Sequence, residues 1–266
     1  MNMEIQLRGK LVLVTGSTKG IGLGIVKEVA REGSDVIING RDKEGINTLV
    51  ASLKDEFPTV SFYEAPYDLS TDFGIQQLKE NFPKIDVLVN NLGIFQPMNY
   101  FEIEENDWTT FFKTNVLAGN ELAKFYLPKM LEQNFGRIIF IASEEAIMPS
   151  GEMPQYSMTK TMNLSLAKSL SKLTIGSQVT INTVMPGPTL TEGVEKMIEE
   201  MYKGSSLSRE EQQQAFMREH RPMSQIQRLI EPSEIGRFIA FIASPLASSF
   251  SGEALRIDGG MVPTIV

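Results

Sequence analysis

Cysteine is absent from this 266-residue sequence, and histidine occurs only once. Without cysteine, the chain has no disulfide bonds, no thiolate nucleophile and no zinc site built on thiolates. A single histidine does not allow a metal centre held by several imidazole rings. We therefore expect no metal site in this protein.

Positive charge is in deficit, with 25 Lys and Arg against 33 Asp and Glu and a formal net charge of -8. Such a chain repels phosphate backbones, so we expect no nucleic-acid partner. No apolar run approaches the roughly 20 residues that span a bilayer, and the opening residues MNMEIQLRGK lack the apolar stretch of a signal peptide. We expect a cytoplasmic protein that does not associate with membranes.

Short apolar runs recur along the chain, and longer stretches with a helical pattern separate them. Most runs lack polar alternation, which is typical of strands buried on both faces. The order predicts an α/β fold: a single Rossmann-type, doubly wound parallel sheet of about seven strands with helices on both faces. No linker or repeat interrupts it, so we predict one domain over residues 1–266. The runs are residues 11–15, 35–39, 60–65, 86–91, 137–143, 179–186 and 253–258.

The stretch from Gly187 to Ile230 contains no strand candidate. Ser208 and Glu211 predict a capping box at the start of one helix within it. An insertion of this length is typical of a lid or a binding loop. We favour a substrate lid over residues 187–230, with a surface helical hairpin as the alternative. An earlier helix is predicted from the spacing of Val194, Met197, Ile198 and Met201.

Residues 11–30, LVLVTGSTKGIGLGIVKEVA, read as a strand, a glycine-rich turn and a helix. Glycines permit a tight turn and let the backbone approach a pyrophosphate, and the helix N-terminus offers free N–H groups to the phosphates. The pattern predicts a dinucleotide site, with a turn that binds no ligand as the alternative. The predicted cofactor contacts are Gly16, Ser17, Thr18, Lys19, Gly20, Ile21 and Gly22.

The second predicted strand ends without the acidic residue that would bind the ribose hydroxyls of NAD. Asn39 and Gly40 are followed directly by Arg41, and Lys19 lies in the glycine loop. Two cations suit the additional 2′-phosphate of NADP, so we predict NADP(H) in preference to NAD(H). Two alternatives stay open: both charges are solvated, or Asp42 supplies the missing acid.

Further motifs follow in a fixed order: NNLG (90–93), TN (114–115), Ser143, YSMTK (156–160), PGPT (186–189) and DGG (258–260). With the glycine loop, they resemble the short-chain dehydrogenase/reductase family nearly end to end, in particular its 3-oxoacyl-acyl-carrier-protein reductase branch. The resemblance implies an NAD(P)-dependent oxidoreductase that transfers a hydride between the cofactor and a carbonyl or secondary alcohol. The alternative is a catalytically silent protein of the same fold that acts as a cofactor-binding sensor or interaction partner.

The resemblance also implies roles for individual residues. Tyr156 would exchange a proton with the substrate oxygen, and Ser143 would hold that oxygen. Lys160 would bind the nicotinamide ribose, and Asn115 would anchor a water that supplies protons to Lys160. Besides Tyr156 and Lys160, the further implied cofactor contacts are Asp68, Leu69, Asn91, Gly93, Pro186, Gly187 and Thr189.

Pro154 suits the first turn of a helix, which places Tyr156 near the helix start and Lys160 one turn later on the same face. Lowering the phenol pKa from about 10 to near 7 requires roughly 4 kcal/mol. A cation about 4 Å away supplies a comparable amount, and an oxidised nicotinamide ring adds a second positive charge. We predict that Lys160 and the bound cofactor together lower the pKa of Tyr156.

Several features allow two interpretations. Glu144 and Glu145 follow Ser143 and either bind a polar or cationic substrate group or are solvated loop charges, which is the interpretation that we favour. Leu92 either presses on the cofactor or packs against the sheet. A second set of residues either meets an anionic substrate or lies on the surface: Arg218, His220 and Arg221.

The segments before the fifth and sixth strands, LEQNFGR and LTIGSQV, are poor in cations. That favours a small free ketone or alcohol over an acidic carrier protein. The segment after Trp108 is apolar on more than one face, which together with the Tyr156 helix predicts a homodimer or homotetramer. Its apolar residues are Phe111, Phe112, Val116, Leu117, Leu122, Phe125 and Tyr126.

Overall fold

A computed structural model describes residues 5–265 and contains one sheet of seven parallel strands in the order β3-β2-β1-β4-β5-β6-β7. Each strand overlaps one predicted run, and the predicted α/β fold is confirmed. The strands are β1 (Leu11–Val14), β2 (Asp35–Gly40), β3 (Phe62–Pro66), β4 (Val87–Asn90), β5 (Gly136–Ile141), β6 (Val179–Pro186) and β7 (Ala254–Ile257).

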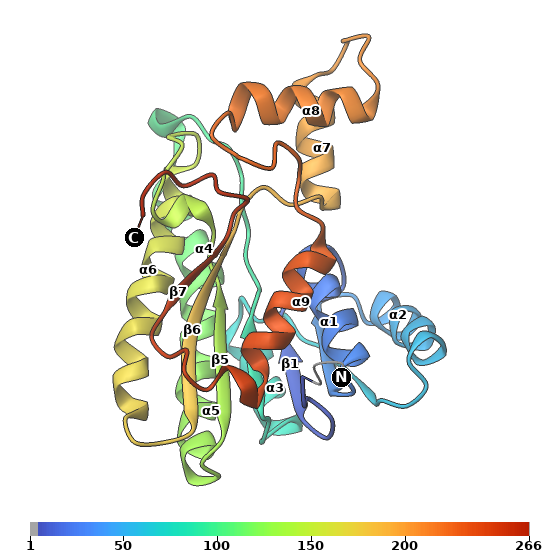
Figure 1. The fold of residues 1–266 in the computed structure, drawn as a ribbon, viewed down its shortest axis with the longest axis vertical. Helices are drawn as coiled ribbons and strands as arrows, with labels where there is room; N and C mark the ends of the chain where they lie inside the picture. Colours follow the sequence, from blue (N-terminus) through green and yellow to red (C-terminus); the bar gives the residue numbers. More distant parts are fainter. Residues whose placement is uncertain (1–4, 266) are drawn as a thin grey trace.

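Helices cover both faces of the sheet (Figure 1). One face packs against α1 (Gly20–Arg31), α2 (Lys43–Glu56) and α9 (Pro232–Ala243). The other packs against α3 (Asp72–Asn81), α5 (Ala118–Glu132) and α6 (Pro154–Ser171), with α4 (Glu105–Phe112) beside α6. Successive strand residues point to opposite faces, so Val12 and Val14 join the first core and Leu13 joins the second.

The strand order positions the site. After the edge strand β3, the chain crosses to β4 on the other side of β1. In open parallel sheets, such a reversal leaves a crevice at the carboxyl ends of the strands, where ligands bind. The glycine loop after β1 and the segments after β4, β5 and β6 all start from this edge.

The insertion after β6 contains α7 (Glu192–Met201) and α8 (Arg209–His220), which stand beyond the carboxyl edge of the sheet (Figure 1). Ser208 caps α8 and forms the predicted capping box with Glu211, so both predicted helices are confirmed. Two backbone hydrogen bonds close the base of the insertion: Ile230 N to Pro188 O at 2.9 Å and Leu190 N to Ile230 O at 2.8 Å. The insertion has a small apolar core of its own, formed by Ile198, Phe216, Met217 and Leu229.

Most apolar residues of the segment around α4 and α5 are buried within the single chain. Phe111, Val116, Leu122 and Tyr126 are buried, whereas Leu117 remains exposed. The excess of apolar residues that predicted an oligomer therefore belongs partly to the core of one chain. A π-helical turn, Lys113–Leu117, joins α4 to α5 and contains Asn115.

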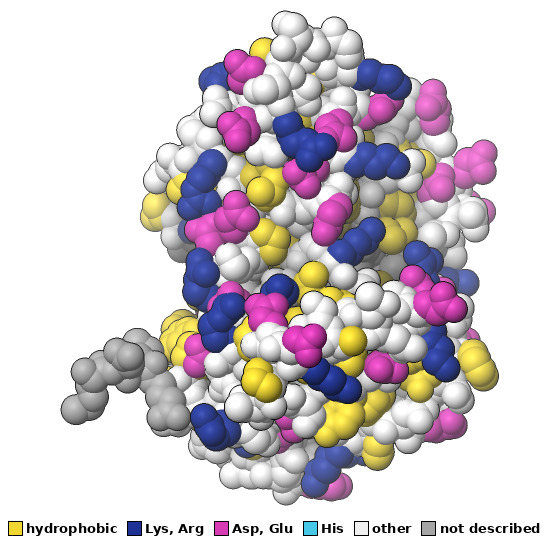
Figure 2. All heavy atoms as spheres, turned by 90° about the vertical axis from the view of Figure 1, so that its right-hand side faces the viewer, with side chains coloured by type: hydrophobic (Ala, Val, Ile, Leu, Met, Phe, Trp, Pro, Cys, Tyr) yellow, Lys and Arg dark blue, Asp and Glu magenta, His cyan; other side chains and the backbone are white. Residues whose placement is uncertain are grey.

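Figure 2 shows Lys and Arg side chains interspersed with Asp and Glu over the face that carries α2. Within residues 5–265, no helix has both the length and the apolar character needed to cross a membrane.

Candidate active site

The glycine loop forms a cradle that side chains would fill. Gly16 and Gly20 have φ values of +60° and +54°, which L-residues with a Cβ rarely adopt. A Cβ on Gly22 would lie 2.5 Å from Gly16 O. The loop therefore leaves its backbone open at the N-terminus of α1, the arrangement that binds phosphate groups. Lys19 is exposed on this loop.

Asn39 at the end of β2 holds the loop in place. Its Oδ1 accepts a hydrogen bond from Gly16 N at 3.0 Å, and its Nδ2 donates to Ala65 O at 2.9 Å. Its backbone N donates to Ser17 Oγ at 3.0 Å, so the buried Ser17 side chain faces β2. In the sequence, Asn39 was noted only because no acidic residue stands at the end of this strand. Its structural role could have been inferred, because a polar side chain buried at the end of an apolar strand needs hydrogen-bond partners.

Residues after β4 support the same loop. Asn91 Nδ2 donates to Thr15 O at 2.9 Å and to Gly16 O at 3.0 Å. Leu92 packs against the core cluster on the α5 face of the sheet, which favours the sheet-packing interpretation. A Cβ on Gly93 would lie 3.3 Å from Lys160 Nζ, so a side chain here would press on the Lys160 ammonium group.

Arg41 and Asp42, which follow β2, have different surroundings. Arg41 is exposed, and its charge helps to lower the pKa of Asp68: burial alone would raise that pKa, but hydrogen bonds from Ser70 and the Arg41 charge outweigh it. Asp42 is the N-cap of α2, where its carboxylate accepts a hydrogen bond from Glu44 N at 3.1 Å. This role disfavours Asp42 as the missing ribose-binding acid.

Lys160 is buried on α6. Its Nζ donates to Ile141 O at 2.8 Å, and burial lowers the pKa of Lys160 to about 8. An ammonium group has three N–H donors, so two remain beyond this bond. The Asn115 side chain is tied in place: Oδ1 accepts from Ile94 N at 2.8 Å, and Nδ2 donates to Thr159 Oγ1 at 3.0 Å.

Tyr156 lies at the third position of α6, which begins at Pro154 as predicted. Lys160 Nζ is 5.4 Å from the centre of the Tyr156 ring, and the ring of Phe95 packs edge-on against it at 6.3 Å. The predicted pairing of Tyr156 and Lys160 on one helix face is therefore present.

The pKa of the Tyr156 phenol is raised, first by burial and then by the negative charge of Glu144, while the Ser143 hydroxyl acts in the opposite direction. The prediction attributed a lowered pKa to Lys160 and a bound cofactor together. The protein groups alone act the other way, because the phenol is poorly solvated and Glu144 lies nearby.

The two acids after Ser143 are not solvated, and the interpretation that we favoured is wrong. Glu144 and Glu145 are 5% and 2% exposed, because the short 3₁₀ turn after β5 directs both side chains inward. Ser143 Oγ donates to Glu144 Oε2 at 2.6 Å. Burial raises the pKa of Glu144 to about 7, although the Ser143 hydrogen bond and the Arg221 charge lower it.

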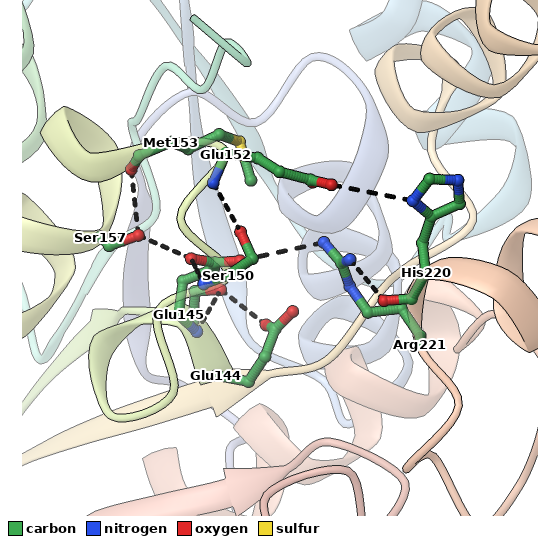
Figure 3. A network of polar contacts seen from close by, with 9 residues as sticks. Glu144, Glu145, Ser150, Glu152, Met153, Ser157, His220 and Arg221 are labelled. Carbon is green, nitrogen blue, oxygen red and sulfur yellow. Dashed lines mark hydrogen bonds and ion pairs between the residues drawn. The ribbon is translucent and has the colours of Figure 1, made fainter. Parts of the chain in front are cut away.

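Glu145 connects three parts of the site (Figure 3). Its Oε2 accepts hydrogen bonds from Ser157 Oγ on α6 at 2.6 Å and from Ser150 N at 3.0 Å. Its Oε1 forms an ion pair at 3.8 Å with Arg221, which follows α8. Glu145 thereby links the turn after β5, α6 and the insertion. No sequence motif had indicated this role.

A cleft of about 140 Å³ lies where these segments meet. Ser143, Tyr156 and Glu144 line one side, and residues of the insertion line the other. Arg221 reaches the cleft, whereas Arg218 is exposed and His220 lies 3.7 Å from Glu152, so the three side chains do not form one group. The remaining lining residues are mostly apolar, and Ile21 and Pro186 among them were predicted as cofactor contacts. Phe95 and Met153 were not predicted, and the others belong to the predicted lid over residues 187–230: Pro188, Val194, Met197 and Phe216.

Thr189 is buried and lines the cleft, and its Oγ1 donates to Gly187 O at 2.8 Å. The start of α7 lies against the glycine loop, because a Cβ on Gly20 would lie 3.2 Å from the Thr191 side chain. Within residues 5–265, no group of three or more His, Asp or Glu side chains is arranged to hold a metal ion.

A family model described as short chain dehydrogenase matches residues 10–202 of the chain. The chain therefore belongs to the short-chain dehydrogenase/reductase family of nicotinamide-dependent oxidoreductases, and the predicted family is confirmed.

Individual relatives agree with this assignment. The chain is 51% identical over 263 residues to "Uncharacterized oxidoreductase YvaG" of Bacillus subtilis, covering 99% of this chain and 100% of the relative. It is 30% identical over 255 residues to the 3-oxoacyl-[acyl-carrier-protein] reductase FabG of Haemophilus influenzae, covering 96% and 99% of the two chains. A crystal structure of L-sorbose reductase from Gluconobacter frateurii, complexed with NADPH and L-sorbose, superposes with a TM-score of 0.91 at 30% identity over 99% and 100% of the chains.

Proposed function

We propose that this protein interconverts a small free ketone and its secondary alcohol, prefers NADP(H), and uses Tyr156 as the general acid and base. The observation that carries the proposal is the cleft at the carboxyl edge of the sheet. Tyr156 and Ser143 line it together, the glycine loop reaches it through Ile21, and Lys160 lies behind the phenol.

During reduction, Tyr156 gives its O–H proton to the substrate oxygen, and during oxidation it takes the proton back. Ser143 holds the same oxygen and stabilises the charge that develops on it. When bound, the nicotinamide cofactor supplies or accepts the hydride. Lys160 would bind the nicotinamide ribose through the donors that Ile141 leaves free, and Asn115 would anchor the water that returns protons to Lys160.

The residues present fit a dinucleotide. The open backbone of the glycine loop, from Gly16 to Gly22, would hold the pyrophosphate. Asp68, Leu69, Asn91 and Gly93 would border the adenosine half, and Pro186, Gly187 and Thr189 the nicotinamide half.

The preference for NADP(H) is supported by two exposed cations, Lys19 and Arg41, at the mouth of the predicted ribose site. Asp42 is engaged as a helix cap, which supports NADP(H) over NAD(H) because NAD would need an acid at this position. The L-sorbose reductase complexed with NADPH supports the same preference.

A free substrate is supported by the narrow cleft, which buried acids and the insertion surround. We also propose that the insertion at residues 187–230 acts as a lid. Leu117 and the other exposed apolar residues near α4 and α6 support a homodimer or homotetramer.

A screen of ketones and alcohols, followed by the absorbance of the reduced cofactor, tests this function. Tyr156→Phe should abolish turnover and leave NADPH affinity near the wild-type value, because only the proton donor is removed. Undiminished turnover in this variant would remove Tyr156 from the mechanism. Binding of NADPH without turnover of any compound would favour the cofactor-binding sensor instead.

A further inference from the structure

The hydrogen bond between Ser143 and Glu144 conflicts with the role proposed for Ser143. A serine hydroxyl carries one proton to donate. In the structure that proton goes to Glu144 Oε2 at 2.6 Å. A substrate carbonyl oxygen only accepts hydrogen bonds, so Ser143 cannot hold it while Glu144 keeps this proton.

Glu144 itself needs further donors. The carboxylate is 5% exposed, and among the described residues Ser143 is the one side chain that donates to it. A carboxylate accepts about four hydrogen bonds, and a buried charge with few partners is costly. Glu144 lines the cleft beside Tyr156, so a donor on the substrate can reach it.

A second unpaired group lies in the same cleft. Arg221 is 9% exposed, and its Nε has no hydrogen-bond partner. Arg221 and Glu144 both line this cleft. The other side of the guanidinium faces Glu145, as Figure 3 shows. Glu145 balances the positive charge of Arg221, but the Nε atom of Arg221 still has no hydrogen-bond acceptor.

A hydroxyl group is the substrate group that fits both atoms, because it donates one hydrogen bond and accepts others. An ammonium group has no lone pair for Arg221 Nε, and a carboxylate has no proton for Glu144. We propose, building on the function proposed above, that the substrate is an α-hydroxyketone whose hydroxyl donates to Glu144 and accepts from Arg221.

This arrangement couples recognition to reduction. The substrate hydroxyl takes the place of Ser143 at Glu144 Oε2, and the Ser143 hydroxyl then donates to the neighbouring carbonyl oxygen. The carbonyl carbon then receives the hydride from the reduced cofactor and its oxygen the proton from Tyr156, which gives a vicinal diol and the oxidised cofactor. A ketone without the hydroxyl leaves Ser143 bonded to Glu144, so the selectivity appears in kcat as well as in KM.

The test compares hydroxyacetone with methoxyacetone, which withdraws electrons similarly but has no proton to donate. Wild-type kcat/KM should be at least about tenfold higher for hydroxyacetone, the factor expected for one hydrogen bond to a charged group. In Glu144→Gln, the amide can itself donate to Ser143, so the preference should fall to about threefold or less while methoxyacetone turnover is kept or rises. Glu152→Gln, which removes a nearby exposed acid outside the cleft, should leave the preference unchanged.

The outcomes separate the two proposals. Equal turnover of both ketones by the wild type, or the same preference in Glu144→Gln, overturns the role of Glu144 while the reductase function stands. No turnover of any ketone, with NADPH bound, overturns both. The wild-type comparison needs no variant, so it decides the question even where Glu144→Gln fails to fold.

Discussion

Replacing Glu144 with glutamine should make the protein more stable at alkaline pH and have little effect at acidic pH. Burial raises the pKa of the Glu144 carboxyl from 4.5 to about 7. The folded protein therefore binds this proton more tightly than the unfolded chain does, and stability falls as the pH rises from the unfolded pKa through the folded one. Glutamine has nearly the same shape, can still form a hydrogen bond with Ser143 through its amide and carries no charge.

The size of the effect follows from the pKa change. At 1.36 kcal/mol per unit, the ionised carboxylate costs the folded state about 3 kcal/mol once the pH is above both pKa values. For a chain of this size, about 3 kcal/mol corresponds to a rise in Tm of roughly 6 °C or more. Arg221, Glu145 and Tyr156 are the charged and titratable groups around Glu144, and the substitution leaves them in place.

Urea unfolding of the wild type and Glu144→Gln, at about pH 5 and about pH 8, measures the difference. The variant should gain most of the 3 kcal/mol between these two pH values, about 2 to 3 kcal/mol. Glu253→Gln, at an exposed acid before β7, serves as the control and should show no pH-dependent gain. A gain for Glu144→Gln that is the same at both pH values would refute the assignment of a buried, ionising carboxyl.

Three further predictions concern the cofactor loop. Gly22→Ala should weaken NADPH binding by about tenfold or more, measured by fluorescence titration, because the new Cβ would lie 2.5 Å from Gly16 O and push the loop out of shape. Lys19→Ala combined with Arg41→Ala should raise the Kd for NADPH at least about tenfold and change the Kd for NADH little, and equal losses for both would contradict the NADP(H) preference. Asn39→Ala should lower the free energy of unfolding by about 2 to 4 kcal/mol, since Gly16 N and Ala65 O lose a buried partner, and a normal denaturation midpoint would argue against this role.

The fold was predictable because most buried strands carry uninterrupted apolar runs, and because the capping box at Ser208 is a local signal. The placement of Tyr156 and Lys160 on one face was also predictable, because residues four apart in a helix lie on the same side of it. The burial of Glu144 and Glu145 was not, since it depends on how a turn after β5 packs against α6 and the end of α8.

The hydrogen-bond partners of Asn39 could not be predicted either, because they are distant in the sequence. Its neighbours Gly16 and Ala65 are 23 and 26 residues away along the chain, and only the parallel register of β1, β2 and β3 brings them together. Long-range partners of this kind leave no periodic mark in the sequence.

The paired backbone bonds between Pro188, Leu190 and Ile230 give the insertion a single narrow stem. The cleft residues in α7 and α8 belong to the insertion and connect to the rest of the chain through that stem. The parallel strands and the glycine loop lie outside the insertion. A hairpin of different length or composition, grafted at the same stem, would alter which molecules enter the cleft, and it would have to keep a cation at the position of Arg221 as the partner of the buried Glu145.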